Sequence, residues 1–90
     1  MSEPTYTPIA CELHDYLEIA CEHHYRLRIE LIDGSRLDAQ ALDTETAPSK
    51  EEFLVVADAA GTQQRLRLDR LRAITPLDDN ARFGRVVLVP

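Results

Sequence analysis

The sequence contains no stretch of apolar residues long enough to cross a membrane, and its start, MSEPTYTP, has neither the basic nor the apolar region of a secretion signal. It also lacks a G-x-S-x-G motif, a P-loop and a G-x-G-x-x-G loop, and hydroxyl side chains are few. No paired nucleophile and base can be identified. These absences predict a cytoplasmic protein that does not bind membranes and is not an enzyme.

Cysteine is also scarce, because the chain holds only Cys11 and Cys21. On one helix their positions would be about 15 Å apart, too far for a disulfide, so we expect reduced thiols. His14, His23 and His24 lie nearby, but helical spacing divides the group into pairs, whereas a structural zinc site needs four ligands. We therefore expect no metal or other cofactor. Cys21 and His24 should instead pack beneath the helix, with His23 solvated at its C-terminal end.

Acidic residues are in excess. Sixteen acidic and ten basic residues give a net charge of −6, which disfavours binding to nucleic acid, and no basic residue precedes Arg26. The second half is by contrast rich in arginine, at Arg65, Arg67, Arg70, Arg72, Arg82 and Arg85. These arginines could bind RNA, or they could pair with the acids of the first two strands, which is the alternative we favour.

The periodicity of apolar residues predicts one small domain, residues 1–90, of mainly β structure. Pro4 and Pro8 indicate that residues 1–8 form an extended lead-in. Helical spacing follows from about Cys11 to His24, and Asp33-Gly34 is typical of a hairpin turn. Strands are expected at 26–32, 36–42, 53–57, 63–69, 71–75 and 86–89.

The polar segment 43–52 is expected to form a loop. The apolar run FLVVA at 53–57 should be a central strand buried on both faces, while Arg65 and Arg67 should point outward from the next strand. Five or six antiparallel strands on so short a chain are most economically arranged as a small, strongly bent barrel, with the single α-helix at the N-terminus.

One side of the predicted helix carries a set of residues that we name the acidic face, namely Glu12, Asp15, Glu18, Glu22 and, among them, Ile19. No lysine or arginine stands three or four residues away to offset the repulsion between the carboxylates. An exposed Ile19 with a charged rim is typical of a protein-binding patch. The alternative interpretation is an ordinary solvated helix surface.

The segments YTPIACELHDYLEIACEHH, RLRIELIDGSRLDAQA, FLVV, AAG and LRLDRLRAI together resemble the Rho-binding antiterminator family, called Rof or YaeO. The resemblance covers about Tyr6 to Ile74, and its most specific parts are Y-x-P-I-x-C, the helix motif D-x-L-E-x-A-C and the DG hairpin. It implies a fold similar to Sm proteins, with an N-terminal helix capping a small bent barrel.

The resemblance also implies a function. Proteins of this family bind the transcription termination factor Rho on its N-terminal RNA-binding region, block loading of the transcript and reduce Rho-dependent termination. Asp15 and Glu18 fall on the helix motif and are the first expected contacts, which Glu12, Ile19 and Glu22 extend.

The family further places contacts in the loop after the second strand, where Lys50 is the only basic residue of this chain. Tyr16 stands where the family commonly has a small polar residue, so it could pack or make contact. We expect a monomer that binds Rho and does not bind nucleic acid directly. The competing hypothesis is an Sm-like RNA-binding module that uses the arginine-rich C-terminal half.

Overall fold

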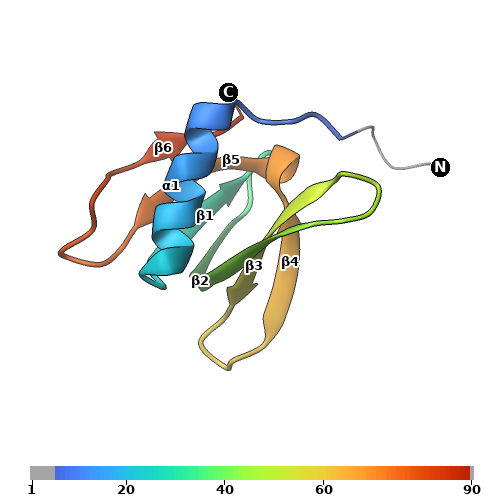
Figure 1. The fold of residues 1–90 in the computed structure, drawn as a ribbon. Helices are drawn as coiled ribbons and strands as arrows, with labels where there is room; N and C mark the ends of the chain where they lie inside the picture. Colours follow the sequence, from blue (N-terminus) through green and yellow to red (C-terminus); the bar gives the residue numbers. More distant parts are fainter. Residues whose placement is uncertain (1–5, 90) are drawn as a thin grey trace.

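The computed structural model describes residues 6–89, which form one α-helix and six strands (Figure 1). The elements are α1 (Cys11–Glu22), β1 (Arg26–Leu31), β2 (Arg36–Thr46), β3 (Glu52–Ala57), β4 (Gln63–Arg67), a 3-10 turn η1 (Leu68–Arg70), β5 (Leu71–Pro76) and β6 (Val86–Val87). Most of the predicted lead-in, residues 1–5, lies outside the described residues. Its described part, residues 6–8, is neither helix nor strand.

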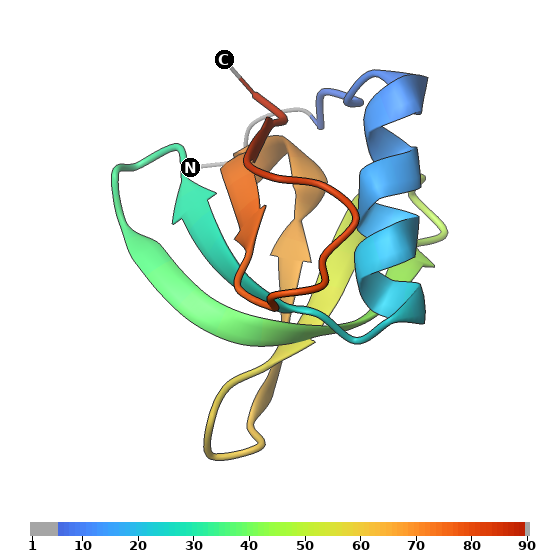
Figure 2. The ribbon, with the colours of Figure 1, turned by 90° about the vertical axis from the view of Figure 1, so that its left-hand side faces the viewer.

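All six strands pair antiparallel in one sheet with the order β4-β3-β2-β1-β5-β6. The long strand β2 bends the sheet, because residues 36–40 pair with β1 whereas residues 40–46 pair with β3, across an irregularity between Ala41 and Asp43. Figure 2 shows β2 curving around the core. The sheet does not close, and β4 and β6 form its two edges. Its strong bend gives it the shape of a small barrel, so the prediction of a mainly β, strongly bent barrel with one N-terminal helix is confirmed.

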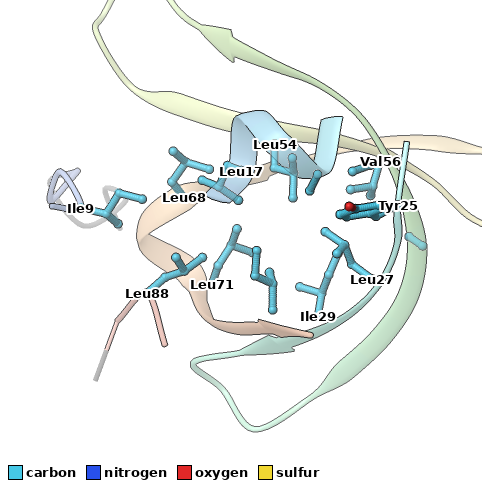
Figure 3. Packing of buried hydrophobic residues seen from close by; sticks show 14 residues of the cluster. Ile9, Leu17, Tyr25, Leu27, Ile29, Leu54, Val56, Leu68, Leu71 and Leu88 are labelled. Atoms are coloured by element: carbon cyan, nitrogen blue, oxygen red, sulfur yellow. The ribbon is translucent and has the colours of Figure 1, made fainter. Parts of the chain in front are cut away.

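A single apolar cluster fills the concave side of the sheet (Figure 3). The helix contributes Leu17 and Ala20, both fully buried, to this cluster. The strands supply alternate residues that point inward, among them Leu27, Ile29, Leu54, Val56, Leu71 and Ile74. Helix α1 therefore covers the open side of the sheet with its apolar surface, and its opposite surface is left to solvent (Figure 2).

The helix ends two residues earlier than predicted, at Glu22, because the chain forms a Schellman motif. The backbone N–H of Tyr25 donates to the carbonyl of Ala20 at 2.9 Å, and that of His24 donates to Cys21 at 3.2 Å. His24 occupies the left-handed position of this motif, with φ of 51°. The prediction that His24 packs beneath the helix is therefore wrong: the residue is exposed beyond the helix end. His23 is exposed as predicted, and its ring stacks on Tyr25 at 5.3 Å.

The hairpin predicted at Asp33-Gly34 is confirmed. Gly34 has φ of 92°, which a residue with a Cβ atom rarely adopts. Asp33 stabilises the turn with its Oδ1, which accepts from both the backbone N–H and the hydroxyl of Ser35 at 2.8 and 2.6 Å.

Three predictions about strands and loops need correction. Residues 43–46 were expected to be loop but continue β2, because they pair with β3 where all four side chains are exposed, and polar residues are tolerated there. The 53–57 run is buried on both faces at Leu54–Val56 as predicted, but it is not the central strand. Strands β2 and β1 hold the middle of the sheet. The 86–89 strand is shorter than predicted and pairs only at Val86–Val87.

Candidate partner-binding site

The carboxylates of the acidic face are exposed along one side of α1, as the sequence predicts. Glu12, Asp15, Glu18 and Glu22 all belong to the exposed class, and the last turn of the helix holds no basic residue. Within the part of the chain that the structure describes, none of the four makes an ion pair. The helix thus presents negative charge that no ion pair within residues 6–89 neutralises.

Ile19 differs from its prediction. It is only partly exposed, because its side chain packs against the core cluster. The acidic face is therefore a surface of carboxylates with an apolar edge, and it has no exposed apolar centre.

Tyr16 lies beside the acidic face and packs rather than standing free. Its ring meets Phe83 edge-on, with centroids 5.1 Å apart, and Phe83 also lies 6.1 Å from the ring of Tyr25. The backbone N–H of Arg82 donates to the Tyr25 hydroxyl at 3.1 Å. These contacts hold the segment 77–85 against the helix. Phe83 could not be identified from the sequence, because it stands alone in a polar loop.

Lys50 is exposed in the turn that joins β2 to β3. The turn is tight, since the N–H of Ala47 donates to the carbonyl of Glu51 and the N–H of Lys50 donates to that of Ala47, both at 2.8 Å. Lys50 itself has φ of 74°, in the left-handed region. The only basic residue of the 43–52 segment is thus held at an exposed position by a defined turn.

A polar cluster connects this turn to the helix. Nε2 of His14 lies 3.3 Å from Oε2 of Glu52, and the Tyr6 hydroxyl donates to the same oxygen at 3.1 Å. Burial and the hydrogen bond to Glu52 raise the pKa of Tyr6 well above its usual range, so the phenol remains a proton donor. The adjacent Glu51 accepts from Nη1 of Arg67 at 3.2 Å. The beginning of β3 is therefore tied both to α1 and to β4.

Arg67 was predicted to point outward, but its side chain is only 6% exposed. Its Nε and Nη2 donate to the two carboxylate oxygens of Asp69 at 2.8 and 2.6 Å, and its guanidinium lies 5.6 Å from the centroid of the Tyr6 ring. Two carboxylates offset the cost of removing this charge from water. The hydrogen bonds from Arg67, with one from the backbone of Thr7, hold the pKa of Asp69 below its usual range.

Other arginines pair with acids of the first two strands, as predicted. Arg85 donates to both oxygens of Glu30 in β1 at 2.8 and 3.1 Å, and Arg65 lies 2.8 Å from Glu45 in β2. Together with the buried Arg67, three of the C-terminal arginines therefore form ion pairs within the protein. The arginine-rich half of the sequence is therefore not a continuous basic surface.

The cysteines and histidines do not assemble into a metal site in the described range 6–89, where no three His, Cys, Asp or Glu side chains come together. Cys11 and Cys21 are free thiols, the first exposed and the second partly buried. Burial raises the pKa of Cys21 to about 11. None of the described helices is both long and apolar enough to span a membrane.

Comparisons with known proteins show which family has this sequence and fold. Residues 8–88 match the family model described as modulator of Rho-dependent transcription termination (ROF). Protein rof of Escherichia coli K12 and protein rof of Shigella flexneri are each 45% identical over 71 residues, which cover 79% of this chain and 82% of theirs.

A solved structure of YaeO from Vibrio cholerae O395, bound to magnesium, has the same fold. Its TM-score is 0.73 at 23% identity, and the match covers 82% of this chain and 95% of that one. The chain belongs to the Rof family of modulators of Rho-dependent transcription termination. The resemblance inferred from the sequence motifs is thereby confirmed.

Proposed function

We propose that this protein inhibits Rho-dependent termination by binding the N-terminal RNA-binding region of Rho and blocking loading of the transcript. The observation that carries the proposal is the acidic face, whose four carboxylates are exposed and without ion-pair partners among residues 6–89. A surface that accepts RNA must be basic to bind phosphates. Carboxylates fixed on a rigid helix can occupy the same surface and exclude RNA from it.

Within this interface, Asp15 and Glu18 are the central contacts, because they lie in the middle turns of α1. Glu12 and Glu22 extend the contact toward the two helix ends, and the half-buried Ile19 adds an apolar edge. Lys50, in the exposed turn between β2 and β3, is a further contact. The polar cluster of Tyr6, His14 and Glu52 supports an interface that includes both α1 and the β2–β3 turn, because it ties the beginning of β3 to α1.

The mechanism needs no catalytic group, so we propose that the protein acts as a binding inhibitor and not as an enzyme. It acts in the cytoplasm, where transcription takes place, as a monomeric single domain spanning residues 1–90, without a cofactor or membrane contact. The acidic face does not contact nucleic acid directly. The alternative of an RNA-binding module has less support, because Arg65, Arg67 and Arg85 are engaged within the protein.

The test is a calorimetric titration of the protein into purified Rho, with and without a pyrimidine-rich RNA already bound. Competition predicts saturable binding to free Rho and none to Rho whose RNA site is occupied. Equal binding to both forms would place the protein elsewhere on Rho, and no binding at low salt would rule out Rho as the direct partner. A separate titration with RNA alone tests the RNA-binding alternative, whose affinity would fall steeply with salt.

A further inference from the structure

An apolar groove lies between the beginning of α1 and the C-terminal strand. Its volume is about 780 Å³, with Ile9 and Leu13 among its lining on the N-terminal side and Ile32 and Val87 on the other. Figure 2 shows the last described residues beside the segment that leads into α1. The groove is of a size typical for ligand and side-chain binding sites.

The groove gathers apolar surface that the fold leaves in water. Among the described residues, three large apolar side chains are exposed, and two of them, Ile32 at 44% and Val87 at 43%, line the groove. The third, Leu77 at 39%, does not. Apolar side chains that gather in one place on a small soluble domain mark an interaction site more often than scattered ones do.

The charged side chains that line the groove among residues 6–89 are Glu12 and Asp69. Arginines lie only beyond Ile32, which also borders a second pocket lined by Arg65, Arg67 and Arg70. Asp69 is already held by Arg67, but Glu12 has no ion-pair partner within residues 6–89. Glu12 is also the first carboxylate of the acidic face, and Glu18 follows about 9 Å further along the helix. The groove therefore continues the acidic face and favours a partner whose apolar group is flanked by positive charge.

We propose that this groove receives an aromatic side chain from the RNA-binding surface of Rho, and the inference rests on the proposed function. Surfaces that bind single-stranded RNA combine a basic groove, which follows the phosphates, with aromatic side chains on which the bases stack. An inhibitor that offered only carboxylates would leave those aromatic rings in water. The acidic face binds the basic groups of Rho that otherwise bind RNA phosphates, and the groove beside Glu12 binds an aromatic ring on which an RNA base otherwise stacks.

The test compares the double variant I32T/V87T with L77T for binding to Rho. Threonine keeps the β-branched shape of isoleucine and valine while adding a hydroxyl group, and Leu77 is a matched control because it is similarly exposed but lies outside the groove. We expect the double variant to bind about fivefold more weakly or worse, with an unchanged salt dependence, and L77T to bind within about twofold of the original protein. Thermal unfolding confirms that all variants remain folded.

A second arm identifies the partner group. The exposed aromatic residues of the Rho RNA-binding surface are replaced one at a time by alanine, and each variant is titrated with the original protein and with I32T/V87T. One aromatic residue should weaken binding of the original protein and have little further effect on the double variant, since the two changes remove the same contact.

The outcomes separate the two proposals. Full affinity of I32T/V87T, or the absence of any coupled aromatic residue, overturns the groove while leaving the acidic face and the proposed function intact. A change in oligomeric state of I32T/V87T, measured by sedimentation, would instead assign the groove to self-association and also overturn the inference. Failure of the original protein to bind Rho at all is a failure of the proposed function.

Discussion

Reversing the charge at the centre of the acidic face, with the variant D15K/E18K, separates a binding role from a structural one. In the original helix, Glu12 and Asp15, Asp15 and Glu18, and Glu18 and Glu22 are spaced three or four residues apart, so each pair repels. The two lysines convert the outer pairs into attractive ones and leave one repulsive pair between them. At about 0.2–0.5 kcal/mol for each pair, the variant should be about 1 kcal/mol more stable.

For a domain of this size, that change raises the midpoint of thermal unfolding by about 4–8 °C. Binding to Rho should change in the opposite direction, because two carboxylates that face basic groups become ammonium groups. A loss of about 3 kcal/mol or more corresponds to affinity at least a hundredfold weaker. Opposite changes in stability and affinity are the result that distinguishes a partner-binding surface.

The matched control is D79K/Q63K/Q64K, which shifts the net charge by the same amount at three exposed positions off the helix. It should reduce Rho affinity only slightly, through the weaker overall attraction between the proteins. Calorimetry at about 0.1 M salt and a thermal melt give both quantities. A large drop in the unfolding midpoint of D15K/E18K would show that the carboxylates are structural, and equal loss of binding in the control would show that only net charge matters.

Three further predictions concern the scaffold. The variant R67A should lower the free energy of unfolding by about 3 kcal/mol, because it leaves two carboxylates without their buried partner. Urea denaturation measures this loss, and a loss under about 1 kcal/mol would contradict the structural role of Arg67. Because the folded-state pKa of Asp69 is depressed, its contribution to stability is complete above the unfolded value near 4 and is lost as pH falls through the folded value. D69N should therefore be less stable than the original protein at pH 7 and lose less on acidification, which thermal melts between pH 7 and pH 2 can measure. Finally, iodoacetamide at pH 8 should alkylate the exposed Cys11 well before Cys21, whose pKa is about 11, and equal rates by mass spectrometry would refute the burial of Cys21.

The periodicity of apolar residues was sufficient to predict the helix and the strands whose side chains alternate between core and solvent. Leu27 and Ile29 are fully buried between exposed Arg26 and Arg28, so the strand and its inward face could be read directly. The helix could be read in the same way, because its carboxylates recur opposite Leu17. These are local patterns, and the core enforces them.

Two of the misses depend on contacts between distant residues. Arg67 follows the outward pattern of Arg65 in sequence, and only the folded chain brings Glu51 and Tyr6 to a guanidinium that its neighbour Asp69 also binds. Ile19 lies among carboxylates on a helical projection, yet it packs against the core cluster. The exposure of the four carboxylates could be predicted, whereas the groove could not, because it combines residues from both ends of the chain.

The connection between the chain ends has a consequence for synthesis on the ribosome. The backbone N–H of Thr7 donates to Asp69, 62 residues later, and Leu88 joins Ile9 in the core cluster. The segment that leads into α1 therefore finds its anchors only when the last strands have emerged, several seconds after the helix itself at bacterial rates of about 5–20 residues per second. Until then the carboxylates of α1 are present on the chain but are not fixed in relation to the groove. A nascent chain that still lacks β6 should accordingly be a poor competitor for Rho, and inhibition should begin only after β6 has left the ribosome.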